Sequence, residues 1–119
     1  MDIETYREYC LSKPFVTEHF PFDEQTLVFK VKNKIFALCD IHQFKSVNLK
    51  CNPEKAIELR AQYDAVHPGF HMSKTHWNTV EFDGSISWKL LREWIDHSYD
   101  MVVAGLSKKE REEIQKLKS

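Results

Sequence analysis

Apolar residues recur at every third or fourth position in three stretches of the chain, the spacing of a helix that buries one side. Each stretch has residues that favour a helix end: Asp2 is a suitable N-cap before the first, and Asn52 with Pro53 opens the second. Pro14 stops the first stretch, and Gly105 is a suitable C-cap for the third. The pattern predicts helices at about residues 3–12, 53–63 and 87–104, and a short charged helix after the capping box Ser107–Glu110.

Between the helical stretches apolar and polar residues alternate, which is the period of a strand with one wet face. Asn33 stands between two such runs and is a turn residue, because asparagine tolerates a positive φ. The run that follows it is apolar on both faces and should be central in its sheet, and the last run should turn Val80 and Phe82 inward. The alternation predicts strands at residues 27–32, 35–39, 47–51 and 78–82.

The order of these elements has hairpins and no strand–helix–strand alternation. It predicts an α+β fold, an antiparallel β-sheet packed by N-terminal and C-terminal helices. We expect residues 17–24 to be a connector in which Phe20 and Phe22 are buried. A length of 119 residues predicts a single domain over residues 1–119.

Charge is spread unevenly along the chain, although the net charge is only −1. The net charges are −4 for residues 1–24, +4 for 25–80, −3 for 81–106 and +2 for 107–119. The middle segment is therefore the one that could face a polyanion, and no field over the whole protein would attract nucleic acid. With no run of about 20 apolar residues and no signal-peptide pattern, we expect no membrane association.

The three cysteines, Cys10, Cys39 and Cys51, are an odd number without a CxxC spacing. That pattern predicts reduced thiols and a cytoplasmic protein. Each cysteine has apolar neighbours and should be a small buried hydrophobic residue. Cys51 lies just before the second helix, whose N-terminus could lower its pKa, so a redox-sensitive thiol is an open alternative.

The most unusual stretch is PGFHMSKTHWNTV, residues 68–80, which has His71, Lys74 and His76 and no carboxylate. Basic groups beside Trp77 suit a nucleic-acid surface or a pocket for an anionic ligand. Trp77 is either an exposed stacking platform or a side chain that covers the sheet edge. The five-residue spacing of the two histidines fits neither a helical metal pair nor a strand face, so we expect no metal site.

That string, with TEHFPFDEQTLVFKVKNKIFAL, VNLKC and LLREWIDHSYDMVV, resembles the MmcQ/YjbR-like family over nearly the whole chain. The resemblance implies a small bacterial protein with a CyaY-like fold. It also implies DNA binding through a "double wing" of strands and helices.

Three lysines around the hairpin tip form a basic wing in which Lys30 and Lys32 should point the same way. A solvated face, or protection of a strand edge, is the alternative. We predict a monomer without cofactor or enzymatic activity that binds duplex DNA weakly and mainly through phosphates. A second hypothesis is a small-ligand or protein-interaction domain with a His/Trp-lined pocket in residues 68–80. The predicted nucleic-acid residues are Lys30, Lys32, Lys34, Lys45, Lys50, His71, Lys74, His76, Trp77 and Asn78.

Overall fold

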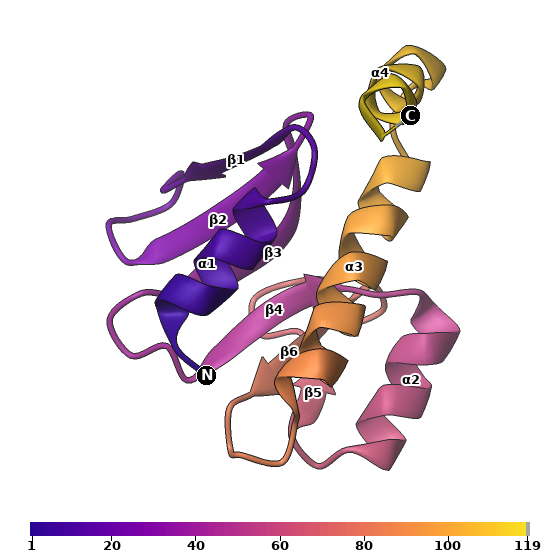
Figure 1. The fold of residues 1–119 in the computed structure, drawn as a ribbon. Helices are drawn as coiled ribbons and strands as arrows, with labels where there is room; N and C mark the ends of the chain where they lie inside the picture. The colour runs from indigo at the N-terminus through magenta and orange to yellow at the C-terminus, as the bar shows by residue number, and fades with distance from the viewer. Residues whose placement is uncertain (119) are drawn as a thin grey trace.

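Within residues 1–118, which this computed structural model describes, six strands form one antiparallel sheet in the order β1-β2-β3-β4-β6-β5 (Figure 1). The strands are β1 Val16–His19, β2 Thr26–Val31, β3 Lys34–Asp40, β4 Ser46–Lys50, β5 Val66–Pro68 and β6 Trp77–Glu81. The helices are α1 Ile3–Leu11, α2 Pro53–Gln62, α3 Trp88–Ala104 and α4 Lys108–Lys118. The predicted α+β fold is confirmed, including the central place of the return strand β3.

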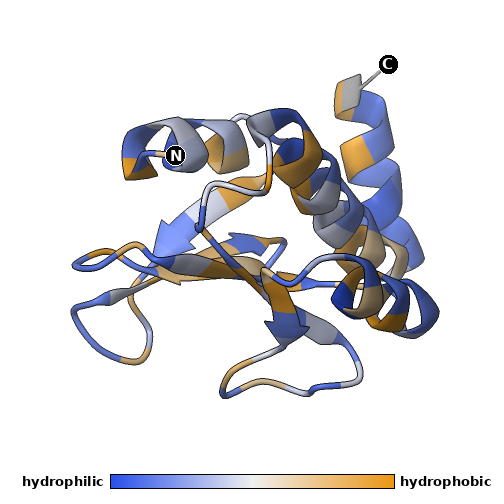
Figure 2. Ribbon diagram, turned by 90° about the horizontal axis from the view of Figure 1, so that it is seen from below, coloured by the Kyte–Doolittle hydropathy of each residue, from blue (hydrophilic) through white to orange (hydrophobic). Residues whose placement is uncertain are grey.

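The helices gather on one face of the sheet, and Figure 2 shows loops extending from the other face. This helix-covered face holds the core, where strand residues such as Phe29 and Val80 meet the helices. The side chains predicted to form the buried side of α3 are all buried: Leu91, Trp94, Ile95 and Val102. Among the described residues, no helix is long and apolar enough to cross a membrane.

Helices begin at the predicted capping residues. The Asp2 carboxylate accepts a hydrogen bond from the Thr5 amide at 2.8 Å, and the Asn52 side chain caps α2 in the same way. At α4 the Glu110 amide donates to the Ser107 hydroxyl at 3.2 Å, and the Glu110 carboxylate accepts from the Ser107 amide. Both halves of the predicted capping box are therefore formed.

The β2–β3 hairpin turns on two residues, Lys32 and Asn33, with φ values of 47° and 73°. Positive φ at both positions is typical of a type I′ turn, so the role predicted for Asn33 is confirmed. The turn removes Lys32 from the strand alternation. Its ammonium lies 3.9 Å from the centre of the Phe15 ring and pairs with Glu113 of α4. The prediction that Lys30 and Lys32 point the same way is wrong.

Two short edge strands lie outside the four predicted strand ranges, β1 at one end of the sheet and β5 at the other. The prediction that Phe20 and Phe22 are buried is also wrong, because their exposed fractions are 48% and 65%. Both side chains lie in the loop that joins β1 to β2, and this loop extends beyond the strands instead of entering the core.

Candidate nucleic-acid interface

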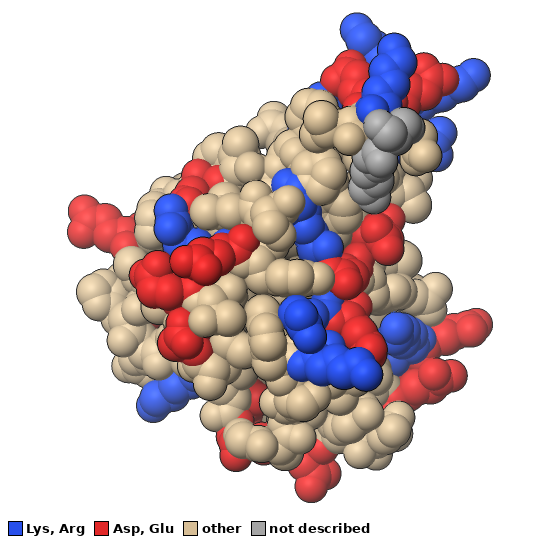
Figure 3. Space-filling model, viewed as in Figure 1, with Lys and Arg blue, Asp and Glu red and all other residues tan. Residues whose placement is uncertain are grey.

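The helix-covered face mixes positive and negative side chains (Figure 3). Several of the cations there are already paired: Arg7 lies 2.6 Å from Glu18, and Lys13 lies 2.5 Å from Asp96. A polyanion would have to displace these carboxylates and would meet others nearby. This face therefore offers little to nucleic acid.

The opposite face of the sheet carries no helix, and we call it the open face. Four of its side chains lie side by side across four strands, in the order Val28, Leu38, Asn48 and Thr79. The loop of residues 20–25 and the loop of residues 69–76 both contribute walls to it. The open face is thus a floor of strands between two loops.

A hollow of about 640 Å³ lies on the open face, with Phe22 from one loop and Phe70 from the other among its walls. We call it the aromatic hollow. The two rings are 65% and 48% exposed, which is unusual for side chains of this size. Asp23 and Asp40 also line the hollow. Hydrogen bonds from the Gln25 and Thr26 amides hold the pKa of Asp23 below its usual range, so this carboxylate is ionised at neutral pH.

A second hollow, of about 540 Å³, lies beside the turn of the β2–β3 hairpin, and we call it the basic hollow. Lys30 of β2, Lys34 of β3 and Lys50 of β4 all line it. None of the three forms an ion pair with another residue in the described part of the chain. Met72 lines both hollows, so the two are neighbours. Val102 and Gly105, at the end of α3, also line the basic hollow, which therefore lies at the edge of the open face.

The basic hollow opens where β3 and β4 part. The two strands are paired from Cys39 and Val47 as far as Ala37 and Leu49. Beyond that point the two strands no longer bond to each other, and the hydroxyl of Ser98, on α3, bonds to both of them instead. It donates to the Phe36 carbonyl at 2.5 Å and accepts from the Lys50 amide at 2.8 Å. One helix side chain therefore satisfies both strands at the point where they diverge.

The loop of residues 69–76 is held on the sheet through the backbone of Phe70. The backbone amide of Phe70 donates to the Thr79 hydroxyl at 2.9 Å. The Phe70 carbonyl accepts from the side-chain Nδ2 of Asn48 at 3.0 Å. Thr79 in turn donates to the Asn48 side-chain oxygen at 2.6 Å, and both side chains are buried. The Phe70 backbone is therefore fixed, although its ring is exposed.

Arg60 of α2 holds the other end of the same loop. Its guanidinium donates to the carbonyls of Lys74 and Trp77 and, at 2.7 Å, to the side-chain oxygen of Asn78. No pattern in the sequence indicated this role for Arg60. These bonds join the loop, β6 and α2 into one unit.

The structure brings together some of the predicted site residues. Lys30, Lys34, Lys50 and Trp77 line the basic hollow, and His71 lines the aromatic hollow. Lys45 is exposed at the opposite end of β4 from Lys50, and His76 is exposed but lines neither hollow. No three His, Cys, Asp or Glu side chains that could hold a metal ion gather in the described residues.

The three other predicted residues have structural partners that limit their contact with a ligand. Lys32 is held by Glu113, and the Lys74 ammonium donates to the Gly69 carbonyl at 3.0 Å within its own loop. Asn78 is 3% exposed and lies on the helix-covered face, where its side chain also donates to a carbonyl of α2. Trp77 is 8% exposed, so it covers the sheet and the alternative of a stacking platform is wrong.

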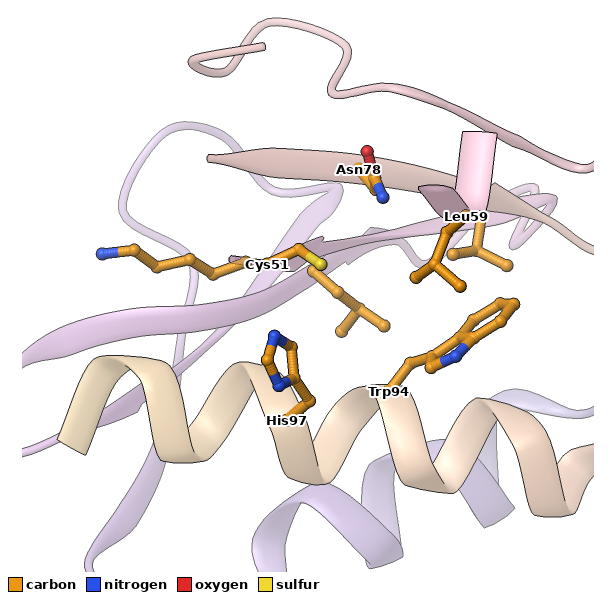
Figure 4. Close-up of a pocket in the computed structure, with 8 residues that line it drawn as sticks. Cys51, Leu59, Asn78, Trp94 and His97 are labelled. Carbon is orange, nitrogen blue, oxygen red and sulfur yellow. The ribbon is translucent and has the colours of Figure 1, made fainter. Parts of the chain in front are cut away.

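The thiols are buried, as predicted. Burial raises the pKa of Cys39 to about 12 and raises that of Cys51 above its usual value, despite the start of α2 two residues later. Figure 4 shows Cys51 and His97 beside a cavity of about 10 Å³, large enough for no more than about one water molecule. His97 accepts a hydrogen bond from the Asn52 amide at 3.1 Å. The lowered pKa expected for a redox-sensitive Cys51 is therefore not found.

Comparison with known proteins shows the family of this chain. The family model described as YjbR matches residues 11–101. The chain belongs to the YjbR family. Escherichia coli O157:H7 YbdF is 36% identical over 113 residues, covering 94% of this chain and 93% of the relative. YjbR of Escherichia coli strain K12 is 33% identical over 112 residues, covering 93% of this chain and 95% of that protein.

Solved structures agree with the family fold. A crystal structure of Deinococcus radiodurans protein DR2400, described with a DUF419 domain, has a TM-score of 0.89 at 40% identity. It covers 96% of this chain and 88% of its own. A Pseudomonas syringae protein has a TM-score of 0.71 at 25% identity, covering 85% and 98%. Membership of the family therefore shows the fold, and the function has to be inferred from the residues on the protein surface.

Proposed function

We propose that this YjbR-family protein binds DNA weakly, through contacts between phosphate oxygens and the lysines of the basic hollow. The observation that supports this most is the convergence of Lys30, Lys34 and Lys50, from three strands, on one surface without carboxylate partners among the described residues. Unpaired ammonium groups around one depression bind phosphate well, because each gains an anion without losing an existing ion pair.

The rest of the surface keeps this binding weak. The net charge is −1, and Asp23 and Asp40 line the neighbouring aromatic hollow. Attraction is therefore local to the basic hollow. Three phosphate contacts predict a slope of about −2 to −3 when log affinity is plotted against log salt concentration.

A second candidate function is the binding of a small planar ligand in the aromatic hollow. Its volume of about 640 Å³ lies in the range of ligand pockets, and two exposed rings belong to its walls. The pocket differs from the one expected from the sequence, because His71 lines it while His76 and Trp77 do not. DNA is the better proposal because it accounts for the unpaired lysines beside the hollow.

Changing Lys30, Lys34 and Lys50 together to glutamine should bring the salt slope close to zero and weaken binding at about 50 mM salt by tenfold or more. Fluorescence anisotropy with a labelled oligonucleotide at several salt concentrations measures both quantities. The matched control changes the exposed Lys89, Lys108 and Lys109 to glutamine, which removes the same charge from α3 and α4.

The control variant should keep most of the wild-type slope. Equal losses in the two triple variants would mean that binding follows net charge alone, and the basic hollow would then have no special role. Absence of binding by the wild-type protein at low salt would remove the DNA proposal and favour the small-ligand function.

A further inference from the structure

We infer that the open face takes single-stranded nucleic acid, with an unstacked base in the aromatic hollow and its phosphate in the basic hollow. This inference rests on the proposed function and adds the form of nucleic acid that the site prefers. It follows from the aromatic side chains, the adjacency of the two hollows and the direction of charge across them.

The aromatic side chains are presented to solvent by a fixed backbone. Phe70 is 48% exposed, yet its amide and carbonyl are both bonded to the buried pair Asn48 and Thr79. The loop therefore cannot easily fold the ring into the core. A flat ring held at the surface with little freedom to lose is what a base needs as a stacking partner. Phe22 adds a second exposed ring from the opposite loop.

The two hollows are adjacent along a single strand. Asn48 lines the aromatic hollow and Lys50 lines the basic hollow, two residues further along β4 and on the same side of the sheet. Two residues of a strand span about 7 Å. A ligand that carries a flat ring and a phosphate a few ångströms apart would reach both hollows, and a nucleotide unit of a single strand has this form.

The charges of the two hollows favour one orientation of a bound nucleotide. Asp23 and Asp40 at the aromatic hollow repel phosphate, while Lys30, Lys34 and Lys50 at the basic hollow attract it. The side chains of Ser46 and Thr26, which also line the aromatic hollow, can exchange hydrogen bonds with the edge of a neutral base. A base thus belongs at the carboxylate end and its phosphate at the lysine end.

A duplex fits this surface poorly. Its bases are paired and stacked, so one could enter the aromatic hollow only after it had been pulled out of the double helix, which breaks its pairing and stacking. A single strand has no pairing to break. The site should therefore favour a single strand over a duplex, although the duplex carries more phosphate.

The test compares three labelled DNAs of one length by fluorescence anisotropy at low salt: a single strand, its duplex, and a strand with abasic sites in place of its bases. We expect the single strand to bind about tenfold more tightly than either of the others. Phe70→Leu keeps an apolar side chain but removes the aromatic ring. It should weaken single-strand binding about tenfold and leave binding of the abasic strand unchanged.

Phe20→Leu is the matched control, because Phe20 is also 48% exposed and lines neither hollow. It should not change binding. Equal binding of all three DNAs, still dependent on the three lysines, would overturn the stacking inference and leave the proposed function intact. An equal loss in both phenylalanine variants would also overturn it. Absence of binding by any DNA would overturn the proposed function itself.

Discussion

Replacing Ser98 by alanine is expected to lower the free energy of unfolding by about 2–4 kcal/mol. The Ser98 hydroxyl is fully buried and is the hydrogen-bond partner of both the Phe36 carbonyl and the Lys50 amide. Alanine would leave the carbonyl of one strand and the amide of the next without this partner. A lost partner at a buried backbone group costs about 1–3 kcal/mol, and two such groups are affected here.

Urea denaturation followed by tryptophan fluorescence measures this change. Ser73→Ala is the control, since Ser73 is exposed in the loop of residues 69–76, and its effect should be within about 0.5 kcal/mol of zero. A Ser98→Ala protein as stable as wild type would show that β3 and β4 can close the gap themselves. The hydroxyl would then not be what holds the basic hollow open.

Gly69→Ala is expected to destabilise the protein by about 1–3 kcal/mol or more and to displace the loop of residues 69–76. A Cβ atom at Gly69 would lie 2.7 Å from the Cβ of Trp77 and 3.0 Å from its carbonyl oxygen. Both contacts are with atoms of a strand that cannot move independently. The Gly69 amide also donates to that carbonyl at 2.8 Å, so the loop and β6 cannot separate without losing this bond.

Gly105→Ala is the matched control, because its nearest neighbour would be a carbonyl oxygen at an ordinary 3.5 Å. Its effect on thermal unfolding should be small. Gly84→Ala distinguishes backbone strain from steric contact. No atom lies within 4 Å of a Cβ at Gly84, but its φ of +89° is unfavourable for alanine. If Gly69→Ala were no more damaging than Gly105→Ala, close packing of the loop on Trp77 would not be what fixes its position.

The sequence predicted elements whose signals are local. α3 was predicted because its period and glycine cap agree over many residues, and its buried side was identified correctly. β1 and β5 have only four and three residues, too few to show a period, so no residue range was predicted for either. Ser98 did leave a signal, since it is a polar residue on the apolar side of α3.

The site was harder to predict because it depends on which face of the sheet remains uncovered. Alternation placed side chains on two faces but could not show that the helices would cover one and leave the other open. Lys32 was assigned to the wing because its turn conformation was not foreseen. The sequence left open whether Trp77 is exposed or covers the sheet edge. Trp77 is buried because position 69, which packs closely against it, is a glycine without a Cβ atom.

DNA is expected to bind at the open face and the adjoining basic hollow, and not on the helix-covered face. An amide chemical-shift titration of isotopically labelled protein with a short single-stranded oligonucleotide tests this claim residue by residue. We predict concentration-dependent shifts at Lys30, Lys34, Lys50 and Phe70, with the surface of α1 unaffected. Shifts confined to α1, α3 or α4, or no shifts at an oligonucleotide excess and low salt, would contradict it.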